Sequence, residues 1–329
     1  MSAYKRNLSF DFIRCVAIVF VICIHSMALI DGMVNLSIFP RLVKTVLDTF
    51  IYSGVPLFIM LSGSLLLTKE ESLSVFFIKR IRRILLPFFL WSMLVYAILY
   101  VQEGGRNPME WFTFFIYKYV TSGVYGIYWY VYLILGLYLI TPLLRKILSG
   151  GDRSLVFYMV GLVSVIYLFV ELFPNVSVTN RFACQNLLYI FYFLWGYIIR
   201  VYLQPLAYFK VIARIGLGIS CGVFMLTGYV GIPLCNLQLV VSTLFLFSVM
   251  VTMKFKQSGI FSDIIRYISK TSYGIYLSHF MFISLFLKFS FVYHIPIAIE
   301  PLVMVMLVLF AECILMYAII RMRLDKWLI

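Results

Sequence analysis

Residues 8–30 read LSFDFIRCVAIVFVICIHSMALI, an apolar run that contains three ionisable side chains, Asp11, Arg14 and His25. A helix needs about 20 mostly apolar residues to cross the hydrocarbon core of a bilayer, and this run is long enough. Two basic residues precede it, as in a signal peptide, but the run contains charges and lacks a cleavage site of small residues. We therefore expect a first membrane span that is retained.

The rest of the chain has the same membrane-like composition. Of its 329 residues, 64% are hydrophobic and 12% are charged, whereas soluble domains are about 45–50% apolar and about 25% charged. Ten segments qualify as spans: 8–30, 52–68, 84–101, 126–144, 154–173, 183–203, 211–230, 236–253, 271–290 and 299–320. No connection between them is long enough for a soluble domain. We expect one all-α transmembrane domain over residues 1–329, with interfacial or re-entrant pieces at 40–51 and 111–123 on the outer side.

The basic residues predict the orientation. With ten spans and a cytoplasmic N-terminus, twenty Lys and Arg residues fall in inner segments and six in outer segments. Cytoplasmic loops of membrane proteins are enriched in Lys and Arg, so both termini are expected inside. The Lys and Arg residues of these loops account for the net charge of +14. Nucleic acid is not an expected partner, because no basic patch stands on a soluble surface.

Common motifs of soluble enzymes are missing from the sequence. The six cysteines occur singly, without a CxxC pair, so neither a metal site nor a disulfide framework is expected. The P-loop, GxGxxG and HExxH motifs are missing as well. Candidate chemistry must therefore be sought among the polar residues of the spans.

The first span has the clearest polar set. Asp11 and Arg14 are three residues apart and can pair on one face of a helix. Arg14 and His25 are eleven residues apart, which is about three turns and about 16 Å of rise, so both face the same way. A packing pair and a histidine bonded to a carbonyl are the structural alternatives. Ionisable residues inside spans are costly, and two aligned ones favour a functional site.

A basic cluster occurs in residues 76–91, FFIKRIRRILLPFFLW. Arg80, Arg83 and Pro87 have the spacing of one helical face, so two guanidinium groups can converge there. Such pairs bind phosphate oxygens through bidentate hydrogen bonds. Anchoring to anionic lipid headgroups is the alternative. With Lys79, the cluster predicts a site for a cytoplasmic ligand that carries phosphate.

Other polar residues lie in later spans. Ser62 and Gly63 make a small polar break, for which close helix packing is the favoured interpretation. His279, near Tyr276, and Glu312 are expected at membrane depth, where each needs a partner or a wet cavity. Five aromatic residues near the outer side can stack on sugar rings or form the interfacial aromatic belt, and the belt is favoured: Trp111, Tyr125, Tyr128, Trp129 and Tyr130.

Five segments, in order, resemble the motifs of one family. Residues 11–26 resemble its arginine–ten residues–histidine motif. Residues 56–67 resemble PLFFxxSGFLL, with Ser64 where an aromatic residue is frequent. Residues 76–91 resemble FxxKRxxRIxxPY.

The later part of the chain continues this resemblance. Residues 127–144 resemble WFLxxLxxxYLxxPLL, and residues 271–280 resemble SYGIYLxH. The family is acyltransferase family 3, the bacterial integral-membrane acyltransferases. The length corresponds to the short form that acylates surface polysaccharides, without an appended hydrolase-like domain.

The resemblance implies an O-acyltransferase of the bacterial cytoplasmic (inner) membrane. Such enzymes move an acyl group, commonly acetyl from cytoplasmic acetyl-CoA, to a hydroxyl of a cell-surface polysaccharide or its lipid-linked precursor. The expected catalytic residues are His25, as general base or transient acyl carrier, and Glu312, as its partner. The residues expected to bind CoA are Arg14, Lys79, Arg80 and Arg83. The residues expected to contact the substrate are Ser62, Trp129, Tyr276 and His279.

Several alternatives stay open at this point. N-acylation and succinyl transfer fit the basic cluster as well as O-acetylation does. A transporter or flippase of a glycan or an amino acid, without acyl transfer, is the alternative from another class. Membrane lipids are expected partners, and a homo-oligomer is compatible with the sequence because lipid-facing and partner-facing apolar surfaces look alike.

Overall fold

A computed structural model describes most of the chain. The described residues are 7–27, 47–48, 50–102, 104, 107–121, 124–150, 153–172, 178–230, 236–289 and 300–329. Every regular element among them is a helix, which confirms the all-α prediction. The segment 40–51, expected at the interface, lies largely outside the described residues.

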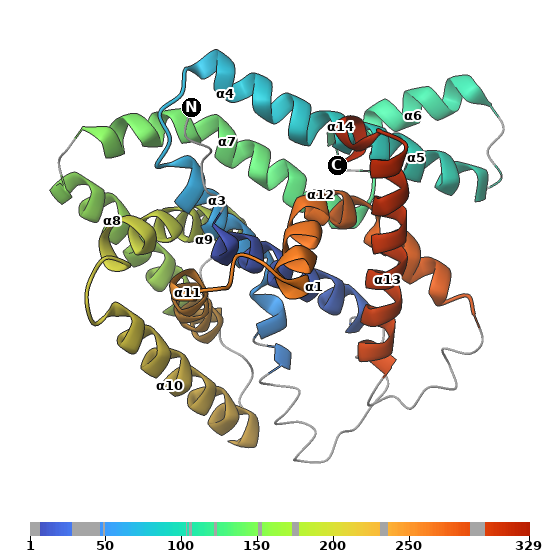
Figure 1. Ribbon diagram of the computed structural model, residues 1–329. Coiled ribbons are helices and arrows are strands. Elements are labelled where there is room, and N and C mark those ends of the chain that lie inside the picture. Colours follow the sequence, from blue (N-terminus) through green and yellow to red (C-terminus); the bar gives the residue numbers. More distant parts are fainter. Residues whose placement is uncertain are drawn as a thin grey trace. The chain divides into compact units, whose positions relative to one another are not determined.

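The helices follow one another along the chain as Figure 1 shows. Their bounds are α1 Leu8–Met27, α3 Gly54–Leu66, α4 Leu73–Arg80, η1 Ile81–Leu85, α5 Leu86–Gln102, α6 Pro108–Thr121, η2 Gly126–Tyr128, α7 Trp129–Ser149, α8 Arg153–Leu172, α9 Val178–Ile198, η3 Ile199–Leu203, α10 Phe209–Val230, α11 Asn236–Thr252, α12 Ile260–Phe286, α13 Glu300–Arg321 and α14 Asp325–Leu328. The elements η1 and η3 are single π-helical turns, and η2 is a 3-10 turn.

Five helical runs are long and apolar enough to cross a membrane: Leu8–Met27, Leu73–Gln102, Gly126–Ser149, Phe209–Thr227 and Leu302–Arg321. Four shorter apolar helices accompany them in the described part of the chain. The protein is therefore a polytopic membrane protein. The count of ten spans and the cytoplasmic termini stay predictions.

Two expected boundaries differ in the structure. The span expected at 84–101 belongs to one helical run that starts at Leu73, so the basic cluster lies within this run and not before its start. The helix expected at 271–290 starts earlier, at Ile260. Residues 111–121 of the segment expected at 111–123 belong to α6, which has 14 residues and so spans only about 21 Å.

Local sequence explains where two helices begin. The side chain of Asn7 accepts a hydrogen bond from the backbone N–H of Ser9 at 3.0 Å and caps α1. Asn107 caps α6 in the same way through the N–H of Met109, also at 3.0 Å. Pro108 follows as the first residue of α6, a position where its missing N–H costs nothing.

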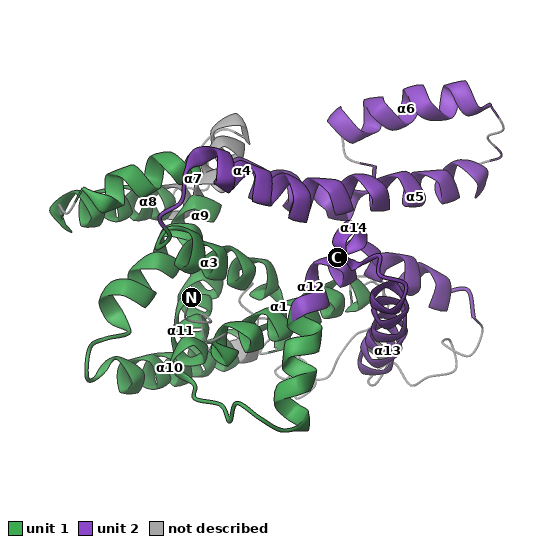
Figure 2. Ribbon diagram, turned by 45° about the horizontal axis from the view of Figure 1, so that its top comes forward, with its two compact units in different colours: residues 1–69, 140–269 green, residues 70–139, 270–329 purple. Residues whose placement is uncertain are grey.

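The chain divides into two compact units, each described by itself (Figure 2). Unit 1 comprises residues 1–69 and 140–269, and unit 2 comprises residues 70–139 and 270–329. The helices α7 and α12 contribute to both. The single domain over residues 1–329 stays a prediction.

Unit 1 is organised around α3, which packs between α1 and α9. A Cβ atom added to Gly63 would lie 1.8 Å from the carbonyl oxygen of Phe193, and one added to Gly196 would lie 2.0 Å from that of Met60. Both glycines are therefore required, because backbone meets backbone where α3 and α9 cross. The expectation of close packing at Ser62 and Gly63 is confirmed.

Unit 2 contains an aromatic core. α6 packs alongside α5 (Figure 2), and Phe88 makes edge contacts with Tyr128 and Tyr132, with ring centroids at 5.3 and 5.5 Å. Tyr128 is fully buried, and its hydroxyl donates to the carbonyl of Leu277 at 2.9 Å. A buried tyrosine of this kind contributes to the protein interior and not to an interfacial belt.

Candidate functional site

The ionisable residues of α1 are arranged as its helical spacing predicts. The guanidinium of Arg14 lies 3.2 Å from a carboxylate oxygen of Asp11, so the expected pair is confirmed. Asp11 is fully buried, and the same oxygen accepts a hydrogen bond of 2.7 Å from the hydroxyl of Ser269, in α12. The Arg14 side chain remains 32% exposed. Asp11 thus holds Arg14 by its charge and leaves part of the guanidinium accessible.

His25 lies near the other end of the same helix. α1 is continuous from Leu8 to Met27, so the rise of about 16 Å between Arg14 and His25 applies to the observed helix. The imidazole of His25 is half-buried. Arg14 and His25 therefore lie about 16 Å apart along the axis of one helix in unit 1.

Two arginines terminate α3 within unit 1. Arg200, in the π-turn η3, donates to the carbonyl of Ser64 at 2.6 Å and stacks over the ring of Phe10, 4.9 Å from its centroid. Arg145 donates through Nε to the carbonyl of Leu66 at 2.8 Å. Cations at the end of a helix satisfy its last carbonyls and oppose its dipole. These two residues have a structural role beyond setting orientation.

Glu71 forms ion pairs with two of the four cations of the basic cluster in unit 2. Its carboxylate lies 2.8 Å from the ammonium of Lys79 and 2.9 Å from the guanidinium of Arg80. Arg80 also stacks on the ring of Phe76, 3.9 Å from its centroid, and donates to the carbonyl of Phe76 at 3.1 Å. Arg80 is therefore largely committed to contacts within the protein.

The remaining cations of the cluster are carried by a π-turn. Pro87 has no N–H, and in an α-helix its ring would collide with the carbonyl of Arg83. The chain widens into η1 just before this proline, and the N–H of Leu86 bonds to the carbonyl of Ile81. Arg82 and Arg83 are exposed, and neither has an ion-pair partner within the described ranges. The one-face spacing predicted for Arg80 and Arg83 assumed an uninterrupted α-helix, which the π-turn replaces.

Glu312 is a fully buried carboxyl group in α13. Its Oε2 accepts a hydrogen bond of 2.8 Å from the hydroxyl of Ser278 in α12. Its Oε1 is buried and has no hydrogen-bond partner in the described part of the structure. A carboxyl group satisfied at only one oxygen is available to a ligand or a proton.

The residues predicted to contact the substrate have different environments. In unit 2, Nδ1 of the buried His279 lies 2.8 Å from the carbonyl of Tyr276, so that nitrogen carries the proton. The hydroxyl of Tyr276 donates to the carbonyl of Ile127. Trp129 is 44% exposed at the start of α7, and Ser62 of unit 1 is half-buried.

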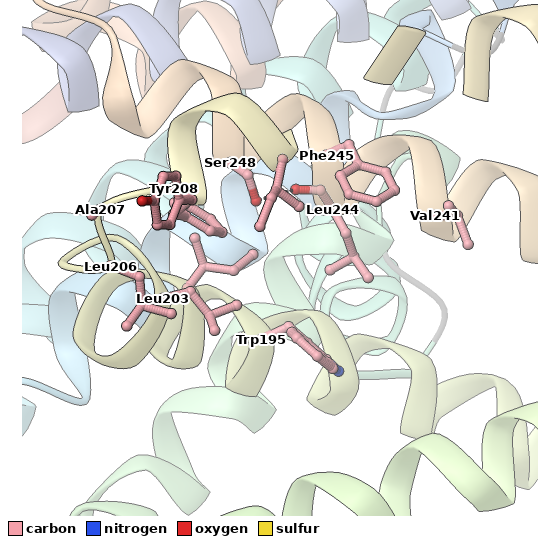
Figure 3. Close-up of a pocket in the computed structure, with 12 residues that line it drawn as sticks. Trp195, Leu203, Leu206, Ala207, Tyr208, Val241, Leu244, Phe245 and Ser248 are labelled. Carbon is pink, nitrogen blue, oxygen red and sulfur yellow. Dashed lines mark hydrogen bonds between the residues drawn. The ribbon is translucent and has the colours of Figure 1, made fainter. Parts of the chain in front are cut away.

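A cavity of about 630 Å³ opens in unit 1, among α9, η3, α10 and α11 (Figure 3). Aliphatic and aromatic side chains line it, including Trp195, Tyr208 and Phe245. The hydroxyl of Ser248 at its wall donates to the carbonyl of Leu244 at 2.7 Å. None of the candidate catalytic and binding residues predicted from the sequence lines this cavity. Its apolar lining is suited to a hydrocarbon chain.

Sequence reasoning missed three residues that hold the candidate side chains. Glu71 pairs with cations eight and nine positions away, and Ser269 and Ser278 reach Asp11 and Glu312 from another helix. An acidic residue just before a basic cluster was the only local signal for Glu71. The two serines have no signal in sequence, because their contacts depend on tertiary packing.

The helices and their buried ionisable groups define a multi-pass membrane protein built for chemistry or transport at membrane depth. The family model described as an acyltransferase domain, that of acyltransferase family 3, matches residues 7–321. The protein belongs to this family and is a membrane-bound acyltransferase. No curated protein and no solved structure matches the chain.

Proposed function

We propose that the protein is an O-acyltransferase of the bacterial cytoplasmic membrane. It transfers an acyl group, most simply acetyl, from cytoplasmic acyl-CoA to a hydroxyl of a cell-surface polysaccharide or its lipid-linked precursor. The observation that carries the proposal is the continuous helix α1, which sets a carboxylate-held arginine and a half-buried histidine about 16 Å apart in a member of an acyltransferase family.

The donor is proposed to bind at the basic π-turn. CoA phosphates need cations with unoccupied hydrogen-bond donors, and Arg83 and its neighbour Arg82 meet this need. Arg80 and Lys79 support the same site less directly, because Glu71 already pairs with both. Arg14, in unit 1, is proposed separately as a donor-binding cation, because its side chain is 32% exposed. These cations bind the phosphates of CoA and not its acyl group. Acetyl is proposed because it is the acyl group that the family commonly transfers.

His25 is the proposed base. Its neutral imidazole removes the proton from the acceptor hydroxyl, whose oxygen attacks the thioester carbonyl. The carbon–sulfur bond breaks, and the CoA thiolate takes the proton back from the imidazolium. In the covalent variant, the imidazole attacks the thioester first, and the hydroxyl then attacks the acyl-histidine. Both routes give one ester and one CoA thiol.

Glu312 is proposed to take part through Oε1. A buried carboxyl group with one unsatisfied oxygen can accept a hydrogen bond from a substrate hydroxyl. The contact with Ser278 fixes the other oxygen. Trp129 is the proposed sugar-stacking residue because its ring is exposed, whereas carbonyl groups already engage the hydroxyl of Tyr276 and Nδ1 of His279.

The decisive experiment compares His25→Ala with Ser26→Ala in purified membranes. Ser26 is the next residue, is buried, and has a hydroxyl without a hydrogen-bond partner in the described residues, so its variant controls for disturbance of α1. We expect His25→Ala to lose at least about 100-fold in acyl transfer from labelled acetyl-CoA, while Ser26→Ala retains activity. Full activity of His25→Ala would exclude the proposed base. Glycan movement in proteoliposomes without acyl-CoA would favour a flippase.

A further inference from the structure

The π-turn η1 is held from outside by a tyrosine. The hydroxyl of Tyr273, on α12, donates to the carbonyl of Ile84 at 3.0 Å. Ile84 lies inside the π-turn, immediately after Arg83. Turns of this kind interrupt the regular hydrogen bonding of a helix, so a hydroxyl that donates to one of its carbonyls fixes the backbone where it is least regular.

The C-terminal helix α14 also supports the π-turn η1 and the helix that follows it. α14 packs against α5 and η1. The indole N–H of Trp91 donates to the carbonyl of Leu328 at 3.0 Å, and the ammonium of Lys270 lies 3.7 Å from the carboxylate of Asp325. The α14 residues in these contacts, Asp325 and Leu328, follow the family match, which ends at residue 321.

The register of the π-turn decides where its cations point. Successive residues of an α-helix are about 100° apart around its axis. If the π-turn relaxed into regular α-helix, the register would shift by one residue, and the side chains on one side of the turn would rotate by about that angle. Arg83 would then present its guanidinium in another direction. Fixing the turn therefore fixes the direction of Arg83.

We infer that Tyr273 and α14 are positioning elements, which hold the π-turn in the register that presents Arg83 to the phosphate groups of the donor. Neither element contacts the donor in this scheme. The inference rests on the proposed CoA site, and it adds a C-terminal segment outside the family match to the parts on which donor binding depends.

The test measures binding of CoA by titration calorimetry, together with KM for acetyl-CoA and kcat, on full-length protein and three variants. Tyr273→Phe removes the hydroxyl, Trp91→Phe removes the indole donor, and a stop after Leu324 removes α14. We expect each to raise the Kd of CoA and the KM about tenfold, as the loss of one well-directed charge-assisted contact does, and to leave kcat within about twofold.

Two further variants separate the possible failures. Tyr317→Phe is the matched control, because Tyr317 is a tyrosine of α13 that is 62% exposed, and it should leave every parameter unchanged. Arg83→Ala should weaken CoA binding at least as much as Tyr273→Phe does. If Arg83→Ala binds CoA normally, the proposed CoA site is wrong.

The positioning role has its own refuting result. If Arg83→Ala binds CoA weakly while Tyr273→Phe, Trp91→Phe and the truncated chain bind it normally, the positioning role is wrong and the CoA site stands. A lower melting temperature with unchanged Kd and KM also overturns the inference, since that pattern indicates support of the fold alone. Trp91→Phe keeps the test decisive if the truncated chain does not fold.

Discussion

The crossing of α3 and α9 predicts that one methyl group will separate two helices. In Gly63→Ala the new Cβ would lie 1.8 Å from the carbonyl oxygen of Phe193, whereas ordinary contacts begin at 3.4 Å. The helices must therefore move apart by about 1.6 Å, the difference between these distances. The obstacle is backbone, so no side-chain rotation relieves it.

The magnitude follows from two opposing effects. Overpacking a tight core costs about 1–3 kcal/mol, and more where backbone must move, while replacing glycine by alanine inside a helix returns up to about 1 kcal/mol. We expect Gly63→Ala to lower the free energy of unfolding by at least about 2 kcal/mol. Gly196→Ala should behave alike, and the double variant should cost less than the sum, because both substitutions separate the same helices.

The assay is denaturation in mixed micelles followed by tryptophan fluorescence. Gly161→Ala and Gly136→Ala are the matched controls, because a Cβ at either position has nothing within 4 Å. These variants should be as stable as the parent protein or more stable by up to about 1 kcal/mol. If Gly63→Ala is as stable as the controls, the close crossing described here is refuted.

Three further predictions concern the polar contacts, each with its own measurement. Asp11→Asn should cost about 1–2 kcal/mol in the same assay, because it removes a charged partner from the partly exposed Arg14; an unchanged midpoint would show that the pair contributes nothing. Arg200→Leu should lower the free energy of unfolding by about 1–3 kcal/mol, because the carbonyl of Ser64 loses a charged donor and keeps only the hydrogen bond from the hydroxyl of Thr68; Arg200→Lys should retain part of the stability. Glu312→Gln should change the free energy of unfolding by less than about 1 kcal/mol, since Ser278 still has an acceptor. The same variant should reduce acyl transfer at least about 100-fold. Full activity in that variant would remove Glu312 from the mechanism.

Local spacing predicted the features that depend on one helix. Asp11 and Arg14 pair because residues three apart are neighbours on any α-helix, whatever packs around them. Gly63 signalled close packing because small residues, glycine above all, let two helix backbones approach closely in a membrane protein. The all-α fold followed from the length and apolar character of the segments, which the bilayer imposes.

The sequence did not predict contacts that depend on a distortion or on another helix. Pro87 predicts a local distortion of the helix. Whether the distortion is a π-turn depends on the neighbouring groups that donate hydrogen bonds to the freed carbonyls. Glu71 contacts Arg80 only because the segment that precedes α4 lies alongside that helix. The contact between Ser278 and Glu312 joins positions on two helices, and no periodicity in either helix specifies which residues meet.

The glycine crossing also has a consequence for biosynthesis. Gly63 and Phe193 are about 130 residues apart, which at about 5–20 residues per second corresponds to roughly ten seconds of translation. During that interval the side of α3 that will receive α9 has no partner from its own chain. α3 has 13 residues, about 20 Å of helix, which is less than a bilayer of about 30 Å requires. The packing of this short helix against α9 must therefore wait for a segment that is made much later.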